Sequence, residues 1–106
     1  MNMQNVEYEE ALNIAKQNGK KLVWLGSEPT DYIRGLLELE EELIVAADPM
    51  EMLNAPKEEL LKYEGSVLVC YHGNTSAFVS EMIKDKHGIE TFNLKGGITS
   101  IVGEIF

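Results

Sequence analysis

Cys70, the one cysteine of this 106-residue chain, is the residue best suited to nucleophilic chemistry. It follows the short apolar run at residues 67–69 and precedes a polar loop and a pattern typical of a helix. A sulfur just before a helix N-terminus faces unpaired backbone N–H groups and the positive end of the helix dipole, and both favour the thiolate. We therefore expect sulfur or oxyanion chemistry, with Cys70 as nucleophile. The loop residues expected to form the anion site are Tyr71, His72, Gly73, Asn74, Thr75 and Ser76.

Charge and composition exclude several other classes of function. The chain has nine basic and eighteen acidic residues, a net charge of −9, so it would repel nucleic acid. One cysteine allows neither an internal disulfide nor a cysteine-rich metal site, and we expect no metal and no organic cofactor. The first residues have neither a basic region nor an apolar run, and no window reaches the roughly 20 apolar residues of a membrane span. We therefore expect a cytoplasmic protein with no membrane partner.

An acidic cluster comes closest to an alternative site. It consists of Glu38, Glu40, Glu41 and Glu42, grouped around Leu39. A run of like charges without histidine or cysteine is typical of a solvated loop or helix end, and we interpret it so rather than as a metal site.

Apolar patterns predict strands alternating with helices along the whole chain. The expected strands are residues 21–25, 43–47, 67–69 and 90–94, and those at 21–25 and 43–47 have the continuous apolar character of strands buried on both faces. The expected helices are residues 6–17, a segment beginning at 27–31 and extending to 37, a short helix capped by Asp48, and residues 56–62 and 76–87. A last apolar segment covers residues 98–106. Residues 1–106 therefore form one α/β domain with a mostly parallel sheet.

This architecture also predicts where side chains lie. Cys70 follows a strand, and ligands of open parallel sheets bind at the carboxyl ends of the strands. Helical spacing predicts that the helix at 76–87 buries a stripe of Phe78, Val79, Met82 and Ile83, and that the helix at 56–62 turns Leu60, Leu61 and Tyr63 inward.

From Ser66 onward the chain resembles a rhodanese-like domain. The family's Cys-x-x-Gly-x-Thr loop is present as residues 70–75, and its Leu-x-Gly-Gly-Ile segment as residues 94–98. Residues 22–27 and 31–35 match the family's first half more loosely. The resemblance implies a sulfurtransferase that carries sulfane sulfur as a persulfide on Cys70. Thiosulfate, mercaptopyruvate or another persulfide would be the donor, and a thiol, cyanide or a protein the acceptor.

The same resemblance implies a role for each loop residue. Backbone amides of residues 71–76 would surround the persulfide, with Gly73 allowing the turn. Thr75 and Ser76 would donate hydroxyl hydrogen bonds to the anion, and a cationic His72 would attract it. We expect a monomer.

Departures from the family pattern leave other functions open. Trp24-Leu25-Gly26 stands where the family usually has Asp-x-Arg, Tyr71 and His72 stand where active members often have a cation, and Ile101 lies near a usual tryptophan position. A rhodanese-like binding or regulatory module without turnover is therefore the alternative. A cysteine-based phosphatase or arsenate reductase is disfavoured, because the arginine of a Cys-x5-Arg loop is replaced by Ser76.

Overall fold

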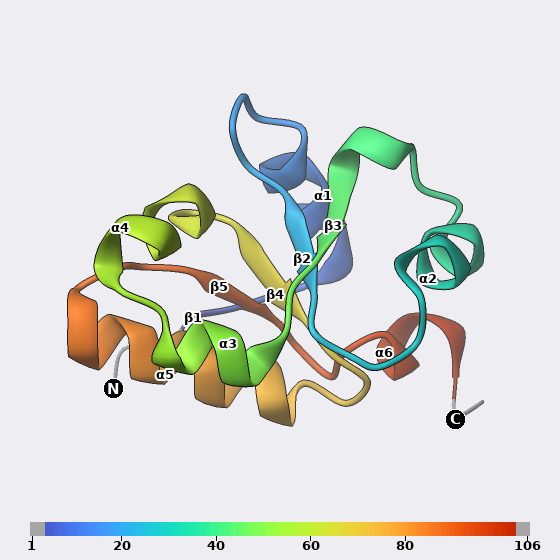
Figure 1. Ribbon diagram of the computed structural model, residues 1–106. Coiled ribbons are helices and arrows are strands. Elements are labelled where there is room, and N and C mark those ends of the chain that lie inside the picture. The colour runs from blue at the N-terminus through green and yellow to red at the C-terminus, as the bar shows by residue number, and fades with distance from the viewer. Residues whose placement is uncertain (1–3, 104–106) are drawn as a thin grey trace.

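The computed structural model describes residues 4–103 and contains a five-stranded, all-parallel sheet with strand order β1-β5-β4-β2-β3 (Figure 1). The strands are β1 Gln4–Val6, β2 Leu22–Trp24, β3 Ile44–Ala46, β4 Val67–Val69 and β5 Phe92–Leu94. The helices are α1 Tyr8–Ala15, α2 Thr30–Leu37, α3 Pro49–Asn54, α4 Lys57–Leu60, α5 Asn74–His87 and α6 Thr99–Val102, with 3-10 turns at Glu41–Leu43 and Leu61–Tyr63. The predicted α/β class with a parallel sheet is confirmed.

Two separate apolar clusters form the core, one on each face of the sheet. Alternation along the central strands divides them, because Leu22 and Trp24 of β2 belong to one cluster and Val23 to the other. Helices α1 and α2 and the α6 segment cover the first face, and α3, α4 and α5 cover the second (Figure 1). The result is a three-layer arrangement with β4 in the middle of the sheet.

Both edges of the sheet differ from the prediction. Residues 4–6 form β1, which pairs with β5, so the first helix begins at Tyr8 rather than at Val6. At the other edge, β3 was expected to be buried on both faces, yet Val45 is 37% exposed and Ala46 is exposed as well. Val45 pairs with the buried Val23 and shares its face, so the helices that cover that face leave the outer strand partly open.

The predicted buried stripe of α5 is half wrong. Val79 and Ile83 are buried, whereas Phe78 is 53% and Met82 39% exposed. Ser76 and Ser80 take the remaining positions against the sheet, three residues before Val79 and Ile83, respectively. Serines are stable there because the neighbouring β5 segment supplies hydrogen-bond partners.

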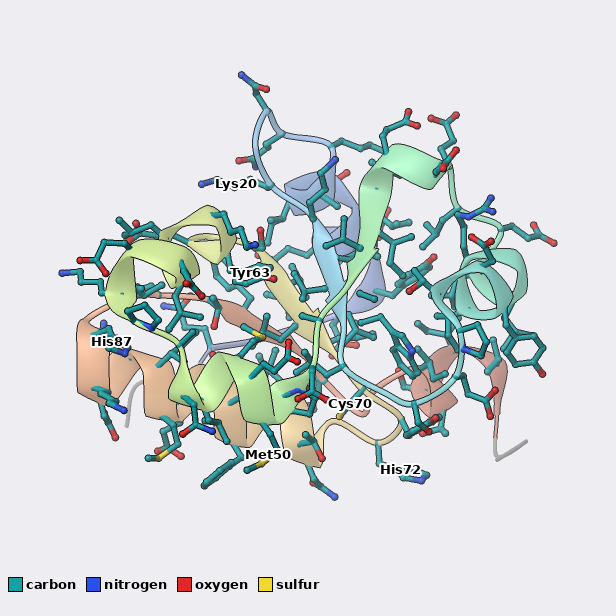
Figure 2. All side chains as sticks on the ribbon, viewed as in Figure 1. Lys20, Met50, Tyr63, Cys70, His72 and His87 are labelled. Carbon is teal, nitrogen blue, oxygen red and sulfur yellow. The ribbon has the colours of Figure 1, made fainter. Side chains whose placement is uncertain are left out.

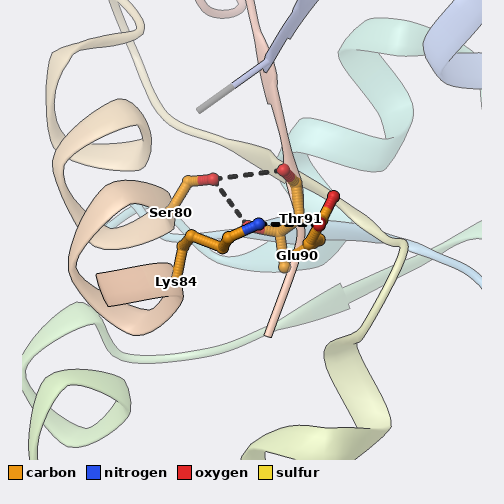
Figure 3. A network of polar contacts seen from close by, with 4 residues as sticks. All are labelled: Ser80, Lys84, Glu90 and Thr91. Atoms are coloured by element: carbon orange, nitrogen blue, oxygen red, sulfur yellow. Dashed lines mark hydrogen bonds and ion pairs between the residues drawn. The ribbon is translucent and has the colours of Figure 1, made fainter. Parts of the chain in front are cut away.

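The second half of α5 shows these partners directly (Figure 3). The Ser80 hydroxyl lies 2.7 Å from Thr91 Oγ1 and 3.3 Å from the Thr91 carbonyl oxygen, and Lys84 Nζ lies 2.6 Å from Glu90 Oε2. These contacts attach α5 to the segment that leads into β5.

The remaining predictions have mixed outcomes. Asp48 caps α3 as expected, since its Oδ2 accepts the Glu51 N–H at 2.9 Å. Leu61 was expected to point inward but is 47% exposed, because the helix ends at Leu60 and a 3-10 turn follows. Of the last apolar segment, residues 99–102 form α6, and residues 104–106 lie outside the described part.

Within residues 4–103, no helix has the length and apolar character needed to cross a membrane.

Candidate active site

The order in which strands are added to the sheet reverses between β2 and β4, which lie side by side. From β2 the chain continues through α2 to β3 on one side, and from β4 it continues through α5 to β5 on the other. Since α2 and α5 lie on opposite faces of the sheet, the segments that leave the two strands diverge. Cys70 is the first residue after β4 and lies at this point (Figure 2). Open α/β sheets bind their ligands at such a switch point.

Polar groups surround the sulfur of Cys70. The backbone N–H groups of Gly73 and Ser76 donate to Sγ at 3.2 and 3.3 Å, and the Ser76 hydroxyl lies 3.2 Å from it. Gly73 has φ +92°, a left-handed conformation that allows the loop to turn its amides back toward the sulfur. Cys70 is only 4% exposed, yet it belongs to neither apolar cluster. The sulfur is therefore buried in a hydrogen-bonding environment rather than among hydrocarbon side chains.

Sγ also acts as the missing cap of α5. Gly73 occupies the N-cap position and has no side chain that could accept a hydrogen bond. Ser76 is the third residue of the helix, and its N–H is one that an N-cap side chain normally binds. Because Sγ accepts this N–H, the partial positive charge of the helix end is directed at the sulfur.

The Gly96-Gly97 segment holds the loop from the other side. The N–H groups of Ile98 and Thr99 donate to the carbonyl oxygens of Cys70 and Tyr71 at 3.0 and 3.1 Å. A Cβ on Gly97 would lie 2.3 Å from the Tyr71 carbonyl oxygen, closer than any side chain can approach. The two sequence motifs, 24 residues apart at Cys70 and Leu94, are therefore parts of one packed structure.

Tyr71 links the loop after β4 to the end of β2. Its hydroxyl accepts the Glu28 N–H at 3.2 Å and lies 3.2 Å from Ser27 Oγ. Trp24, which is fully buried, donates its indole N–H to the Glu28 carbonyl oxygen at 2.8 Å. The loop after Cys70 is thus attached to the end of β2 by an aromatic residue, at the place where the sequence lacks Asp-x-Arg.

Comparison with known proteins gives one class of match. No protein-family model matches the sequence, and no curated protein matches it. Among solved structures, a rhodanese-like domain protein from Staphylococcus aureus is similar, with a TM-score of 0.62, 18% identity, and coverage of 96% of this chain and 92% of that one. The chain has a rhodanese-like fold.

Two further structures share this rhodanese-like architecture. A rhodanese-related protein from Thermoplasma volcanium has a TM-score of 0.61 and 18% identity, covering 97% of this chain and 94% of its own. A protein from Staphylococcus saprophyticus has a TM-score of 0.62 and 15% identity, covering 97% of each chain. At these identities the likeness establishes the fold, and the chemistry has to be argued from the residues of this chain.

The other predicted loop residues lie on the outside of the loop. His72 projects away from the body of the protein (Figure 2), and its Nδ1 lies 3.2 Å from Thr99 Oγ1. Since the Thr99 hydroxyl donates to the Gly96 carbonyl oxygen at 3.0 Å, it accepts from His72, which places a proton on Nδ1. Asn74 and Thr75 are exposed on the first turn of α5, and their roles toward an anion stay predictions.

Asn93 is part of the site and was missed from the sequence. It is 3% exposed, accepts the Ser76 hydroxyl through Oδ1, and donates through Nδ2 to Asn5 Oδ1 at 2.9 Å. The available signal was its position between Phe92 and Leu94 in a strand of a parallel sheet, where a buried amide needs partners. The second partner, Asn5, could not be found because β1 was not predicted.

A cavity lies away from Cys70. It measures about 630 Å³ and lies at the amino ends of the strands, between α1 and the segment from α2 to β3. Its rim mixes lysines with glutamates, and it contains neither a cysteine nor a histidine. Within residues 4–103 no group of three or more histidine, cysteine, aspartate or glutamate side chains is arranged to hold a metal ion. Cys70 therefore remains the strongest candidate for chemistry.

Proposed function

We propose that this protein is a sulfurtransferase that carries sulfane sulfur as a persulfide on Cys70. The observation that carries the proposal is the pair of N–H groups, from Gly73 and Ser76, that donate to Sγ at the start of α5. They stabilise a negative sulfur both as the attacking thiolate and as the persulfide anion. The rhodanese-like fold agrees with this chemistry.

The reaction has two balanced displacement steps. The Cys70 thiolate attacks the outer sulfur of the donor, forming an Sγ–S bond while the donor's bond to that sulfur breaks and its electron pair leaves with the remaining group, sulfite in the case of thiosulfate. An acceptor thiolate or cyanide then attacks the outer sulfur of the persulfide. The Sγ–S bond breaks, and its electron pair returns to Cys70 as thiolate.

Charge favours some donors over others. The chain has a net charge of −9, and the loop at residues 71–76 contains no lysine or arginine. A doubly charged donor such as thiosulfate would meet a repulsive field. A small persulfide or a persulfide carried by another protein requires less compensation, and we expect such donors to load Cys70 faster than thiosulfate does.

Intact-mass spectrometry tests the proposal. The protein is incubated separately with thiosulfate, mercaptopyruvate and a small-molecule persulfide, and its mass is measured before and after reduction. We expect a gain of one sulfur atom that reductant removes and that is absent in C70S. If none of the three donors yields this adduct, or if C70S acquires it as well, the proposed reaction is wrong.

The burial of the sulfur favours a second function, that of a rhodanese-like binding module. Cys70 is only 4% exposed, so it offers a donor little surface for attack. The rate of alkylation by iodoacetamide near neutral pH distinguishes the two functions. A functional sulfur carrier reacts well above the rate of an ordinary free thiol, whereas a binding module reacts at that rate or below it.

A further inference from the structure

A chain of hydrogen bonds connects the buried sulfur to the surface at β1. The Cys70 Sγ lies 3.2 Å from the Ser76 hydroxyl, which donates to Asn93 Oδ1, and Asn93 Nδ2 donates to Asn5 Oδ1 at 2.9 Å. Ser76 and Asn93 are 0% and 3% exposed, whereas Asn5 is exposed. Each link is a side chain with a polar partner on both sides, so the direction of one hydrogen bond determines the direction of the next.

The direction shown fits the protonated thiol. A serine hydroxyl has one hydrogen, and here Asn93 Oδ1 receives it. Ser76 Oγ can then only accept from Sγ, which requires an S–H. A thiolate or a persulfide has no hydrogen to give, so it needs the Ser76 hydroxyl to turn and donate to it.

The two asparagines allow this reversal without the loss of a hydrogen bond. A half-turn of each amide exchanges its oxygen and nitrogen. Asn5 Nδ2 then donates to Asn93 Oδ1, Asn93 Nδ2 donates to Ser76 Oγ, and the Ser76 hydroxyl donates to Sγ. Only a side chain with both a donor and an acceptor at its end can serve position 93 in both directions, because a carboxylate accepts only and a hydrocarbon does neither.

We propose that Asn93 is a positioning residue that sets the direction of the Ser76 hydroxyl and so matches the site to the charge of Cys70. With the thiol, Asn93 accepts from Ser76. When Cys70 loses its proton to a buffer base, Asn93 turns and donates, and Ser76 stabilises the anionic sulfur. No bond other than S–H changes, and the amides carry no proton. This inference deepens the proposed function but concerns the ionisation of Cys70 rather than sulfur transfer.

Two substitutions at position 93 should act differently. In N93D the carboxylate holds the Ser76 hydroxyl away from the sulfur, so the midpoint of the pH profile of alkylation by iodoacetamide rises. In N93V position 93 offers neither donor nor acceptor, so the hydroxyl can still donate to the thiolate and the midpoint should stay close to that of the native protein. We expect the N93D shift to be about one unit, the size of one hydrogen bond to a charged group. The midpoint reports ionisation even where burial slows the reaction.

The S76A background separates this mechanism from simple charge or packing effects. Without the hydroxyl, N93D should move the midpoint only by the direct repulsion between its carboxylate and the thiolate, and therefore by less than in the native background. An N93V midpoint that rises as much as that of N93D, or an N93D shift of unchanged size in S76A, would overturn the proposal.

A variant at the exposed end of the chain keeps the test decisive if a buried variant fails to fold, as judged by circular dichroism. In N5D the new carboxylate binds Asn93 Nδ2 and so keeps Asn93 Oδ1 facing Ser76. The midpoint of the alkylation profile should therefore rise. The rise should be smaller when the same substitution is made in the S76A background. Equal shifts in both backgrounds contradict the proposal. None of these measurements involves a sulfur donor, so failure here is distinct from failure to load a persulfide.

Discussion

Tyr71 packs its ring edge-on against Trp24, with the ring centroids 5.0 Å apart and the planes at 82°. This is a favourable T-shaped arrangement, and it joins the loop after Cys70 to the fully buried end of β2. Together with the Tyr71 hydroxyl contacts to Ser27 and Glu28, it supports the loop on the side opposite the Gly96-Gly97 segment.

Tyr71→Phe should weaken the loop without removing the aromatic contact. The variant loses the hydroxyl contacts to Ser27 and Glu28, and we expect a loss of about 1 kcal/mol in the free energy of unfolding, measured by urea denaturation. Y71L also loses the ring contact, and its free energy of unfolding should be lower than that of Y71F by roughly 1 kcal/mol. A Y71F variant as stable as the native protein would show that the hydroxyl contributes nothing to the attachment.

Gly97→Ala should be far more harmful than the same change at Gly88. Both glycines have similar backbone angles, φ +67° and +73°, so both variants pay about 1 to 2 kcal/mol for a left-handed alanine. Only at Gly97 does the new Cβ meet the Tyr71 carbonyl oxygen, while at Gly88 it meets nothing within 4 Å. We expect the free energy of unfolding, measured by urea denaturation, to fall by about 1 to 3 kcal/mol more in G97A than in G88A. Equal losses would mean that the loop moves aside freely.

Replacing Cys70 tests whether its sulfur caps α5. C70S keeps an acceptor for the Ser76 N–H, whereas C70A leaves that group without one. We expect C70A to be less stable than C70S by about 1 kcal/mol, the usual value of an N-cap, in thermal or urea unfolding. Since both variants lose the sulfur's volume, their difference reports the cap. A C70A variant at least as stable as C70S would contradict this role.

Tyr8 should make the protein less stable at alkaline pH. Burial, and after it the nearby Glu38 carboxylate, raises the pKa of Tyr8 above its ordinary value of 10.0. The unfolded chain therefore ionises at lower pH, and stability is full below about pH 10 and falls as pH rises through the higher folded pKa.

Two variants check the assignment to Tyr8. In Y8F the fall in unfolding free energy above pH 10 should be smaller than in the native protein, and in E38Q it should be reduced to a lesser extent, because Glu38 is the smaller cause. Identical pH profiles of the native protein and Y8F would remove Tyr8 as the source.

Local patterns were sufficient to predict the centre of this fold. The strand at residues 67–69 was predicted with its observed bounds, because an apolar run between Gly65 and a polar loop permits little else. The turn after it follows from Gly73, and the capping of α3 follows from Asp48. These features depend on residues close together in the chain.

Features that depend on distant partners could not be predicted from local pattern. Gln4 and Asn5 have no apolar periodicity, and they form a strand only because β5 offers a free edge. Phe78 was expected to be buried by its apolar character, but Ser76 and Ser80 face the sheet because Asn93 and Thr91 bind their hydroxyls. In α5, two polar residues thus face the sheet at positions where another segment supplies a hydrogen-bond partner.

The pairing of β1 with β5 means that the surroundings of Cys70 are completed late in folding. Asn5 and Asn93, which continue the polar chain from the sulfur, are 88 residues apart in sequence. Closing so long a loop is slow, and during synthesis it cannot occur until β5 has left the ribosome. A nascent chain therefore contains Cys70 and the residues of α5 before it contains the strand that completes their polar surroundings.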